Sequence, residues 1–230
     1  MTDTAWWQVY RSMDGIEVFA IGLSPDAALE GYALGLLSQP ERTRYRRFLV
    51  EDARQQFLLA RGALRLLLSK RLNRVPAAIS FATEAYGKPY AIVDDVPAPV
   101  SFNISHSGDD GLIALTGSRS VGIDLERRRP QVDLDGVAAR VFGARERAVL
   151  SGLTGRKKLD LFYQLWTCKE ALIKAKGTGF SYDPTRFEVP DTILAGGSSA
   201  RFGFPDDDTQ HWMLEDLGSD TYAAALAYQP

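Results

Sequence analysis

Two long stretches with apolar side chains at helical spacing constrain the fold of this 230-residue chain more than any other feature. The first lies within residues 41–72, and its apolar face comprises Phe57, Ala60, Leu64, Leu67 and Leu68. The second lies within residues 159–176, and its apolar stripe comprises Phe162, Leu165, Trp166, Leu172 and Ile173. Each stretch therefore predicts an amphipathic helix that packs on a hydrophobic core.

Strand-like segments surround both helices in a similar order. In the first half we expect strands at residues 16–22, 79–82 and 112–116. In the second half a strand at 120–125 and a helix near 137–150 precede the long helix, and strands follow at 187–189, 211–214 and 222–227. The repeated order predicts an α+β fold of two similar halves, residues 1–117 and 118–230, that could have arisen by duplication.

Composition and charge exclude several classes of protein. A net charge of −2 gives no reason to expect nucleic-acid binding. Cys168 is the one cysteine, so an internal disulfide is impossible and a reducing compartment fits. The sequence has no signal-peptide pattern and no apolar stretch of membrane-spanning length. We therefore expect a cytoplasmic protein that binds neither nucleic acid nor membrane.

Arginines are concentrated in one segment of the chain. Residues 41–74 contain ten Lys or Arg residues against three acids. Arg47, Arg54 and Arg61 are seven residues apart and would line one side of a continuous helix. This pattern is typical either of a site for an anionic ligand or of a solvated helix face, and the residues alone leave both open.

The segment VGIDLE, residues 121–126, carries two carboxylates two residues apart. In a strand, Gly122, Asp124 and Glu126 face one side while the three apolar residues face the other. Two carboxylates this close repel each other unless a cation offsets them. The pattern fits a metal site with a glycine that lets a ligand approach, or a solvent-facing edge strand.

Three of the charged residues on the second long helix are informative. Glu170 and Lys174 are four apart and share a face, which is also the spacing of an ordinary exposed ion pair. Lys169 falls within the apolar stripe, so it needs a carboxylate partner if it is buried.

The available ligands favour a hard cation. Asp124, Glu126 and Glu170 offer oxygen ligands of the kind that Mg²⁺ prefers. The chain has two histidines and one cysteine, which excludes a His/Cys metal centre. Mg²⁺ with a nearby lysine is suited to splitting a phosphoanhydride, because negative charge develops on the leaving phosphate.

Two further segments could bind phosphate. SFNISHSG, residues 101–108, runs from a strand into a turn with Ser, His and free backbone N–H groups, and YGKP places Lys88 in a Gly/Pro turn. A Ser–His hydrolase is the alternative for Ser105 and His106. It is weakened by the lack of a G-x-S-x-G motif and because adjacent residues of a strand point apart.

The motifs FNISHSG, VGIDLE and LWTCKEALIKAKGTG occur in this order, with RYRRFLVEDAR and YGKP upstream. Together they resemble the signature stretches of the 4′-phosphopantetheinyl transferases, from about Arg44 to Gly179. The length and two-part layout are similar to the larger, monomeric, surfactin-type branch. The resemblance implies two α+β halves related by pseudo-twofold symmetry.

The resemblance also implies an activity: transfer of the 4′-phosphopantetheine group of coenzyme A to a serine of an apo acyl or peptidyl carrier protein, with Mg²⁺, releasing adenosine 3′,5′-bisphosphate. It implies that Asp124, Glu126 and Glu170 are the metal ligands, that Glu170 is the base and that Lys174 stabilises the pyrophosphate. The coenzyme A positions that it implies are Arg44, Lys88, Asn103, Ser105, His106, Asp124, Glu170 and Lys174. Coenzyme A binding would then lie mainly in the first half, with the metal and catalysis in the second.

Two other functions compete with this interpretation. A Mg²⁺-dependent nuclease or phosphodiesterase often has a lysine two residues after a strand carboxylate, and here Arg128 follows Glu126 at that spacing. A carrier-protein or acyl-CoA binding module without catalysis would not need Asp124 or Glu170, and both are present. For the carrier we expect residues 137–142 to be a candidate docking surface.

Overall fold

The computed structural model describes residues 6–131 and 133–230, which form two compact units. The first unit runs to Glu84 and resumes at Pro89–Ser118, and the second comprises Ala85–Lys88 and Arg119–Pro230. The turn that carries Lys88 therefore groups with the second unit, although it lies in the first half of the sequence.

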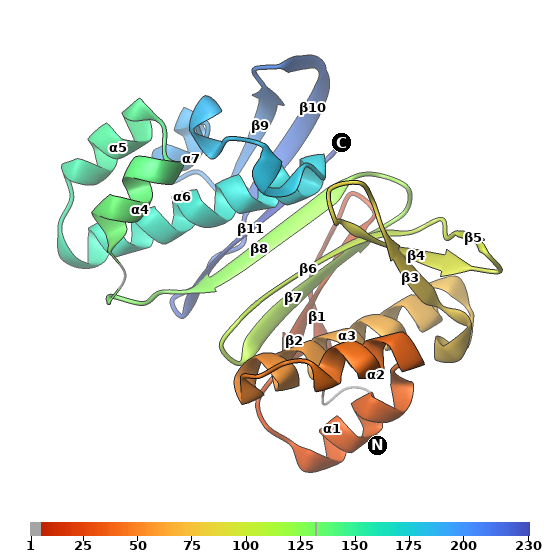
Figure 1. Cartoon of the computed structure of the whole chain (residues 1–230). Coiled ribbons are helices and arrows are strands. Elements are labelled where there is room, and N and C mark those ends of the chain that lie inside the picture. The colour runs from red at the N-terminus through yellow and green to blue at the C-terminus, as the bar shows by residue number, and fades with distance from the viewer. Residues whose placement is uncertain (1–5, 132) are drawn as a thin grey trace. The chain divides into compact units, whose positions relative to one another are not determined.

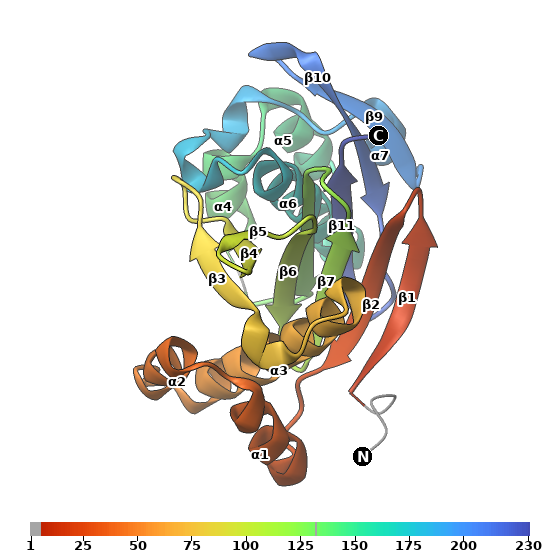
Figure 2. The same ribbon diagram turned by 90° about the vertical axis from the view of Figure 1, so that its right-hand side faces the viewer.

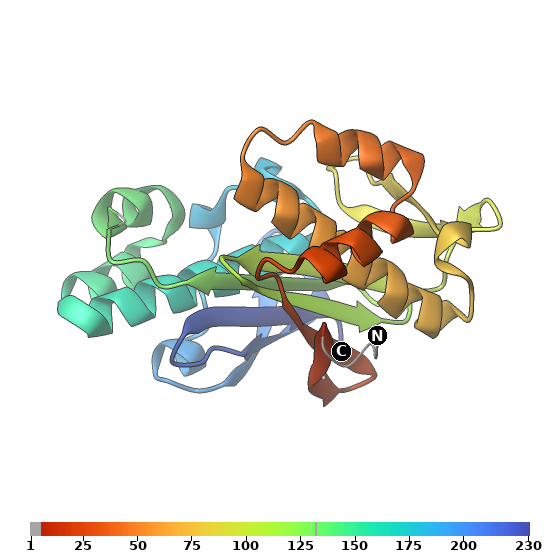
Figure 3. The same cartoon turned by 90° about the horizontal axis from the view of Figure 1, so that it is seen from below.

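The first unit is built on an antiparallel sheet with strand order β1-β2-β7-β6. Its strands are β1 (Trp7–Met13), β2 (Ile16–Gly22), β6 (Ser101–Ser107) and β7 (Asp110–Thr116). A smaller sheet contains β3 (Ser80–Thr83), β4 (Pro89–Val93) and β5 (Val96–Pro97). The helices are α1 (Ala27–Leu36), α2 (Gln39–Arg46), α3 (Glu51–Leu72) and a 3₁₀ turn at Pro76–Ala78. The orange helices lie over the green strands β6 and β7 in Figure 3.

The single helix expected over residues 41–72 is wrong, because the chain folds back between α2 and α3. Glu41 at the start of α2 accepts a hydrogen bond of 2.8 Å from Nε of the buried Arg65 on α3. In one continuous helix these residues would be about 36 Å apart, at about 1.5 Å per residue. The turn also brings Phe48 to 5.2 Å from Phe57, ring centre to ring centre. Arg47 therefore does not share a helix with Arg54.

The predicted apolar face of α3 is confirmed. Four of its five residues are buried in the core, and Phe57 packs against the same core at partial exposure. The same core contains Phe19 and Ile21 of β2 and Phe102 of β6, so α3 covers one face of the sheet.

The second unit has an antiparallel sheet with strand order β8-β11-β10-β9. Its strands are β8 (Val121–Arg127), β9 (Ser199–Phe204), β10 (Asp207–Asp216) and β11 (Tyr222–Tyr228). Its helices are α4 (Leu134–Val141), α5 (Ala144–Ser151), α6 (Gly155–Lys176) and α7 (Asp191–Leu194), with 3₁₀ turns at Gly179–Ser181 and Pro184–Arg186. Figure 1 shows α6 lying along β8 and β11, and Figures 1 and 2 show α4 and α5 beside it.

Two local predictions in this unit are wrong. The helix expected near 137–150 is interrupted at Phe142 and Gly143, where the buried Glu146 of α5 accepts the Gly143 N–H at 2.7 Å and so starts a new helix. The strand expected at 187–189 is a buried loop, in which Phe187 and Val189 enter the core without pairing with a strand.

The two units repeat one topology. In each, a strand precedes a 22-residue helix, and the last two strands of the unit complete the sheet, the last of them pairing with that first strand. These elements are β2, α3, β6 and β7 in the first unit and β8, α6, β10 and β11 in the second. The predicted fold of two similar α+β halves is confirmed. In the part of the chain that the structure describes, no helix has the length and apolarity that a bilayer span requires.

A close approach between α6 and β8 determines how the second unit packs. A Cβ atom added at Gly122 would lie 2.2 Å from the carbonyl oxygen of Ala171 and 2.3 Å from the amide nitrogen of Ala175. Both distances are far below van der Waals contact, so only glycine fits between the strand and the helix. The glycine and the two alanines let the helix backbone lie directly on the strand.

We predict that Gly122→Ala destabilises the protein, because the new methyl group pushes α6 away from β8. Overpacking of this kind costs about 1–3 kcal/mol, which denaturant unfolding would measure. Gly203→Ala in β9 is the matched control, since a Cβ atom there meets nothing within 4 Å. Equal stability of the two variants would contradict the close-approach interpretation.

Candidate active site

The carboxylates of β8 face α6, as the alternation of the strand predicts. Gly122 faces the backbone of α6, and Asp124 shares its side of the strand. Asp124 is 3% exposed, and its Oδ1 lies 2.6 Å from Nζ of Lys174 on α6. The same ammonium donates to the carbonyl oxygen of Ile123 at 3.2 Å. Lys174 therefore joins α6 to β8 at the predicted site.

Glu170, one helical turn before Lys174, belongs to the same electrostatic cluster. Burial raises the pKa of its carboxyl, and the negative charges of Asp124 and Glu126 raise it further, while Lys174 lowers it. No local pattern in the sequence predicts that Glu170 approaches the β8 carboxylates. Packing of α6 on β8 brings it within their electrostatic range.

The donor set at this place fits a divalent cation in its chemistry. Three carboxylates repel one another, and this repulsion adds to the effect of burial in raising the pKa of Glu170. A cation such as Mg²⁺ would relieve it with oxygen ligands. Across residues 6–131 and 133–230, however, no three side chains among His, Cys, Asp and Glu are already gathered in a ligating geometry. In this arrangement the positive charge beside Asp124 is the Lys174 ammonium.

Lys88 lies at the other end of the contact between α6 and β8. Its ammonium donates to the carbonyl oxygen of Val121 at 3.0 Å and to that of Ala175 at 3.2 Å. The carbonyls in the last turn of a helix carry partial negative charge, so a lysine is favourable there. Lys88 thus links the start of β8 to the end of α6.

The first unit holds the other predicted positions, and these do not share one surface. Asn103 and Ser105 lie on one face of β6, and His106 lies on the other. Ser105 and His106 were expected in the turn. The strand continues through Ser107, however, so both residues lie in the strand. Because they point to opposite faces, they cannot form the Ser–His pair of a hydrolase. The turn itself is held by Gln56 of α3, which donates to the carbonyl oxygen of Gly108 at 2.9 Å.

Arg44 lies on the exposed side of α2 and belongs to a cluster of arginines and aromatic rings. Its guanidinium lies 5.0 Å from the centre of the Phe57 ring. Arg61 lies 4.4 Å from the centre of the Phe81 ring. Burial lowers the pKa of Arg61 to about 10, although Glu41 opposes the shift. The concentration of arginine in residues 41–74 is therefore partly structural, and Arg44 is one of its exposed members.

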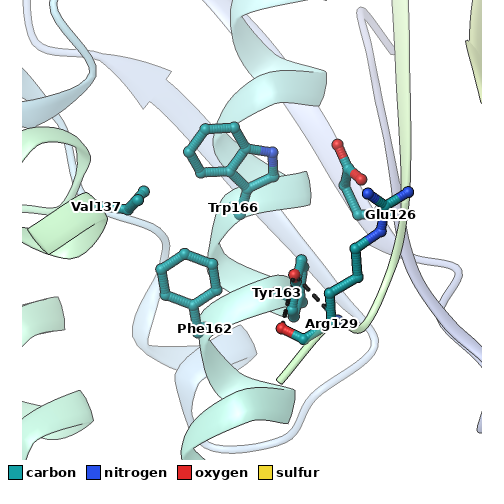
Figure 4. Close-up of a pocket in the computed structure, with 6 residues that line it drawn as sticks. All are labelled: Glu126, Arg129, Val137, Phe162, Tyr163 and Trp166. Carbon is teal, nitrogen blue, oxygen red and sulfur yellow. Dashed lines mark hydrogen bonds between the residues drawn. The ribbon is translucent and has the colours of Figure 1, made fainter. Parts of the chain in front are cut away.

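A pocket of about 230 Å³ adjoins Glu126 in the second unit. Trp166 and Phe162 of α6 line it with their rings stacked at 6.3 Å, and Val137 of α4 extends the apolar wall (Figure 4). Arg129 and Tyr163 complete the lining, and the Tyr163 hydroxyl accepts the backbone N–H of Arg129 at 3.1 Å.

The sequence did not predict that these residues line a pocket. Helical spacing predicted that Trp166 and Phe162 belong to the buried stripe of the helix, but Trp166 is only half-buried. Their spacing of four residues, one turn before Glu170, is the signal that could have indicated a lined pocket.

Comparison with known proteins identifies the family. Residues 25–118 match the family model described as the N-terminal part of 4′-phosphopantetheinyl transferases, and residues 120–227 match that of the 4′-phosphopantetheinyl transferase superfamily. A Synechocystis sp. protein that carries the same family name is 38% identical over 87% of this chain and 82% of its own length.

The 4′-phosphopantetheinyl transferase HetI of Nostoc sp. is 37% identical over 73% of this chain and 71% of its own length. The chain belongs to the 4′-phosphopantetheinyl transferase family. The transferase Sfp of Bacillus subtilis is similar too, with 33% identity over 68% of this chain and 67% of its own length. The resemblance stated from the motifs is confirmed, and with it the prediction that this protein is a transferase enzyme.

The geometry of this transferase also argues against a nuclease-type site. Arg128, the cation two residues after Glu126, lies 2.8 Å from the Asp160 carboxylate and donates to the carbonyl oxygen of Ser219 at 2.7 Å. Arg128 therefore connects α6 to the loop before β11. Membership of an enzyme family likewise argues against a binding module without catalysis.

We predict that Glu170→Gln stabilises the transferase at pH 7.5 in EDTA. The pKa of Glu170 is raised in the folded state. The carboxyl group of Glu170 therefore makes its full contribution to stability only below the unfolded pKa of about 4.3. That contribution is lost as the pH rises through the folded-state pKa. Glutamine resembles the protonated form and avoids the repulsion. Thermal unfolding should give a higher Tm for the variant at pH 7.5 and equal values near pH 4. Glu84→Gln, at an exposed position, should leave Tm unchanged at both pH values.

Proposed function

We propose that this transferase moves the 4′-phosphopantetheine group of coenzyme A to a serine of an apo acyl or peptidyl carrier protein, with Mg²⁺, and releases adenosine 3′,5′-bisphosphate. The observation that carries the proposal is the charge cluster between β8 and α6, in which Asp124 and Glu126 meet Glu170 and Lys174. Splitting a pyrophosphate needs such a combination of acidic ligands, a lysine and a base.

Glu170 is suited to accept the proton of the carrier serine. A serine hydroxyl is a weak nucleophile and needs a base at its oxygen. The raised pKa of Glu170 makes its carboxylate a better proton acceptor than an ordinary surface glutamate. Lys174, whose ammonium lies beside Asp124, is placed to offset negative charge on the leaving phosphate.

Asp124, Glu126 and Glu170 would hold Mg²⁺, which supplies charge neutralisation to the pyrophosphate oxygens. Buried Asp124 is fixed by its contact with Lys174, so one ligand is oriented before the substrate arrives. Glu126 is partly exposed and lines the adjacent pocket, which leaves it accessible to a ligand.

Coenzyme A would be held by Arg44, Lys88, Asn103, Ser105 and His106, together with the residues of the charge cluster. The position of β6 at the edge of its sheet supports this, because a ligand that lies along an edge strand can reach side chains of both faces. The exposed Arg44 offers a permanent charge to a phosphate.

The pocket beside Glu126 would receive the apolar part of the transferred arm. Its walls of Trp166, Phe162 and Val137 are apolar, and Glu126, one of the proposed metal ligands, also lines it. For the carrier we propose the neighbouring surface of α4. Of the expected docking residues 137–142, Phe142 is buried and cannot take part, whereas Ala139 and Arg140 are exposed. We further propose that the protein acts as a monomer in the cytoplasm.

The test of the function is mass spectrometry of carrier domains after incubation with the purified protein, coenzyme A and Mg²⁺. We expect the mass of one phosphopantetheine group to be added to an apo carrier, and EDTA to prevent it. A panel of fatty-acid, polyketide and peptide carriers would show which class is served. If none of them is modified at any Mg²⁺ concentration, the proposed function is wrong.

Variants separate the metal site from coenzyme A binding. Asp124→Ala should abolish turnover, at a loss of about 10³-fold or more in kcat, because a metal ligand and the partner of Lys174 are lost together. Arg44→Ala should mainly raise the KM for coenzyme A, since one charged contact with a phosphate is worth about 1.5–3 kcal/mol. Full activity of Asp124→Ala at limiting Mg²⁺ would contradict the metal assignment.

Filling the pocket tests its role in binding the arm. Val137→Trp should raise the KM for coenzyme A and leave the affinity for adenosine 3′,5′-bisphosphate unchanged, because that product lacks the arm. Val149→Trp, at an exposed position of α5, is the matched control and should change neither. Isothermal titration and steady-state kinetics provide both values. Loss of product affinity in Val137→Trp would place the pocket at the adenosine end instead.

A further inference from the structure

Lys169, the charged residue within the apolar stripe of α6, has the buried carboxylate partner that its position requires. Its Nζ lies 2.9 Å from Oε2 of Glu146 on α5, and the side chains are 1% and 0% exposed. Burial lowers the pKa of Lys169, and the charge of Glu146 opposes that shift. None of the proposed catalytic steps uses either residue.

The pair connects three segments of the second unit. Lys169 donates to the carbonyl oxygens of Pro184 at 2.8 Å and Phe187 at 2.6 Å. Glu146 accepts the N–H groups of Gly143 and Val189, each at 2.7 Å. The start of α5 and the loop that includes residues 184–189 are thereby attached to one point on α6.

Stability alone does not explain a buried pair of this kind. Removing two charges from water costs several kcal/mol per ion, and apolar replacements of similar volume are often at least as stable. A fully hydrogen-bonded pair can instead specify one arrangement among several, as a buried polar contact sets register in a coiled coil.

The small residues at the contact between α6 and the sheet do not by themselves specify such a register. Gly122 of β8 meets Ala171 and Ala175 of α6, and the facing residues of β11 are also alanines, Ala223, Ala225 and Ala227. Small residues permit close approach, but they interlock little, so they resist sliding or rotation of a helix weakly.

Lys169 lies on the side of α6 away from these small residues. Successive helix residues are about 100° apart, so Lys169 and Ala171 are separated by about 200° around the axis. Glu170 and Lys174 lie between the two sides and face the carboxylates of β8. A point fixed at Lys169, together with the contact between Lys174 and Asp124, therefore determines where Glu170 lies relative to Asp124.

We propose that the Lys169–Glu146 pair is a positioning device that sets the register of α6 on β8, and so places Glu170 and Lys174 against Asp124. The inference rests on the proposed function for its effect on catalysis, but its structural part is independent of it. Lys169 and Glu146 are positioning residues and do not touch the substrate.

Two variants test the proposal. Glu146→Asp keeps the charge and shortens the reach by one methylene, and Lys169→Met removes the ammonium. We expect kcat to fall about 10- to 100-fold, the range found when groups that orient a metal ligand are changed. The affinity for adenosine 3′,5′-bisphosphate should be unchanged. Glu146→Asp remains informative if Lys169→Met does not fold.

The control is Arg145→Met, which loosens the same loop without touching α6. Arg145 of α5 binds Glu188 at 3.1 Å and the carbonyl oxygen of Val189 at 3.1 Å. We expect it to lower Tm and leave kcat unchanged. If the Lys169–Glu146 pair only stabilised the fold, all three variants would have a lower Tm and a normal kcat below the unfolding transition.

A second readout does not depend on activity. Nuclear Overhauser effects between the α protons of Gly122 and the amide proton of Ala175 report the register of α6 on β8 directly. We expect these effects to weaken in Glu146→Asp and to persist in Arg145→Met. Unchanged effects and normal kcat in folded Glu146→Asp would overturn the proposal. If the wild-type protein modifies no carrier but these effects still change, the proposed function fails and the positioning role stands.

Discussion

The close approach of α6 to β8 at Gly122 is the constraint on which the proposed active site depends. Because no side chain separates the two backbones there, the carboxylates of the strand and the charged face of the helix lie within hydrogen-bonding or electrostatic range. Lys88 and Lys174 then bridge the same two elements from positions along the contact. A wider spacing would leave Asp124 and Glu170 as separate surface carboxylates.

One helix carries charged residues in two different environments. Lys169 is directed into the protein and is fully bonded by a carboxylate and two carbonyls. Glu170, its neighbour in sequence, has a pKa that is raised by burial and, further, by the like charges of Asp124 and Glu126. The contrast separates a structural charge from a reactive one: the first has all its partners within the protein, while the second is left in electrostatic conflict that a cation or a substrate can relieve.

The sequence predicted those features that follow from local periodicity. Alternation in residues 121–126 placed Asp124 and Glu126 on one face. Helical spacing identified the buried residues of α3 and α6, except that Phe57 and Trp166 are only partly buried, and it showed that Lys169 needs a partner. It failed where tertiary contacts override the local pattern. The break between α2 and α3 depends on Glu41 meeting Arg65, 24 residues away, and the loop at residues 187–189 resembles a strand because its apolar residues are buried. The approach of Glu170 to β8 and the partner of Lys169 required the fold itself, since neither is encoded in neighbouring residues.

The two roles proposed for Glu170, base and metal ligand, make opposite demands on its carboxylate. A base needs a raised pKa, which burial and the charges of Asp124 and Glu126 supply. A metal ligand experiences a cation, which stabilises the ionised form and lowers the pKa. The two duties are compatible if the cation is held mainly by Asp124 and Glu126, so that Glu170 contributes one oxygen and keeps the other for the serine proton. The partial exposure of Glu126 and the fixed orientation of Asp124 suit such a division. The proposed register of α6 would then matter, because a small rotation of the helix would change how the two oxygens of Glu170 lie relative to Asp124 and Glu126.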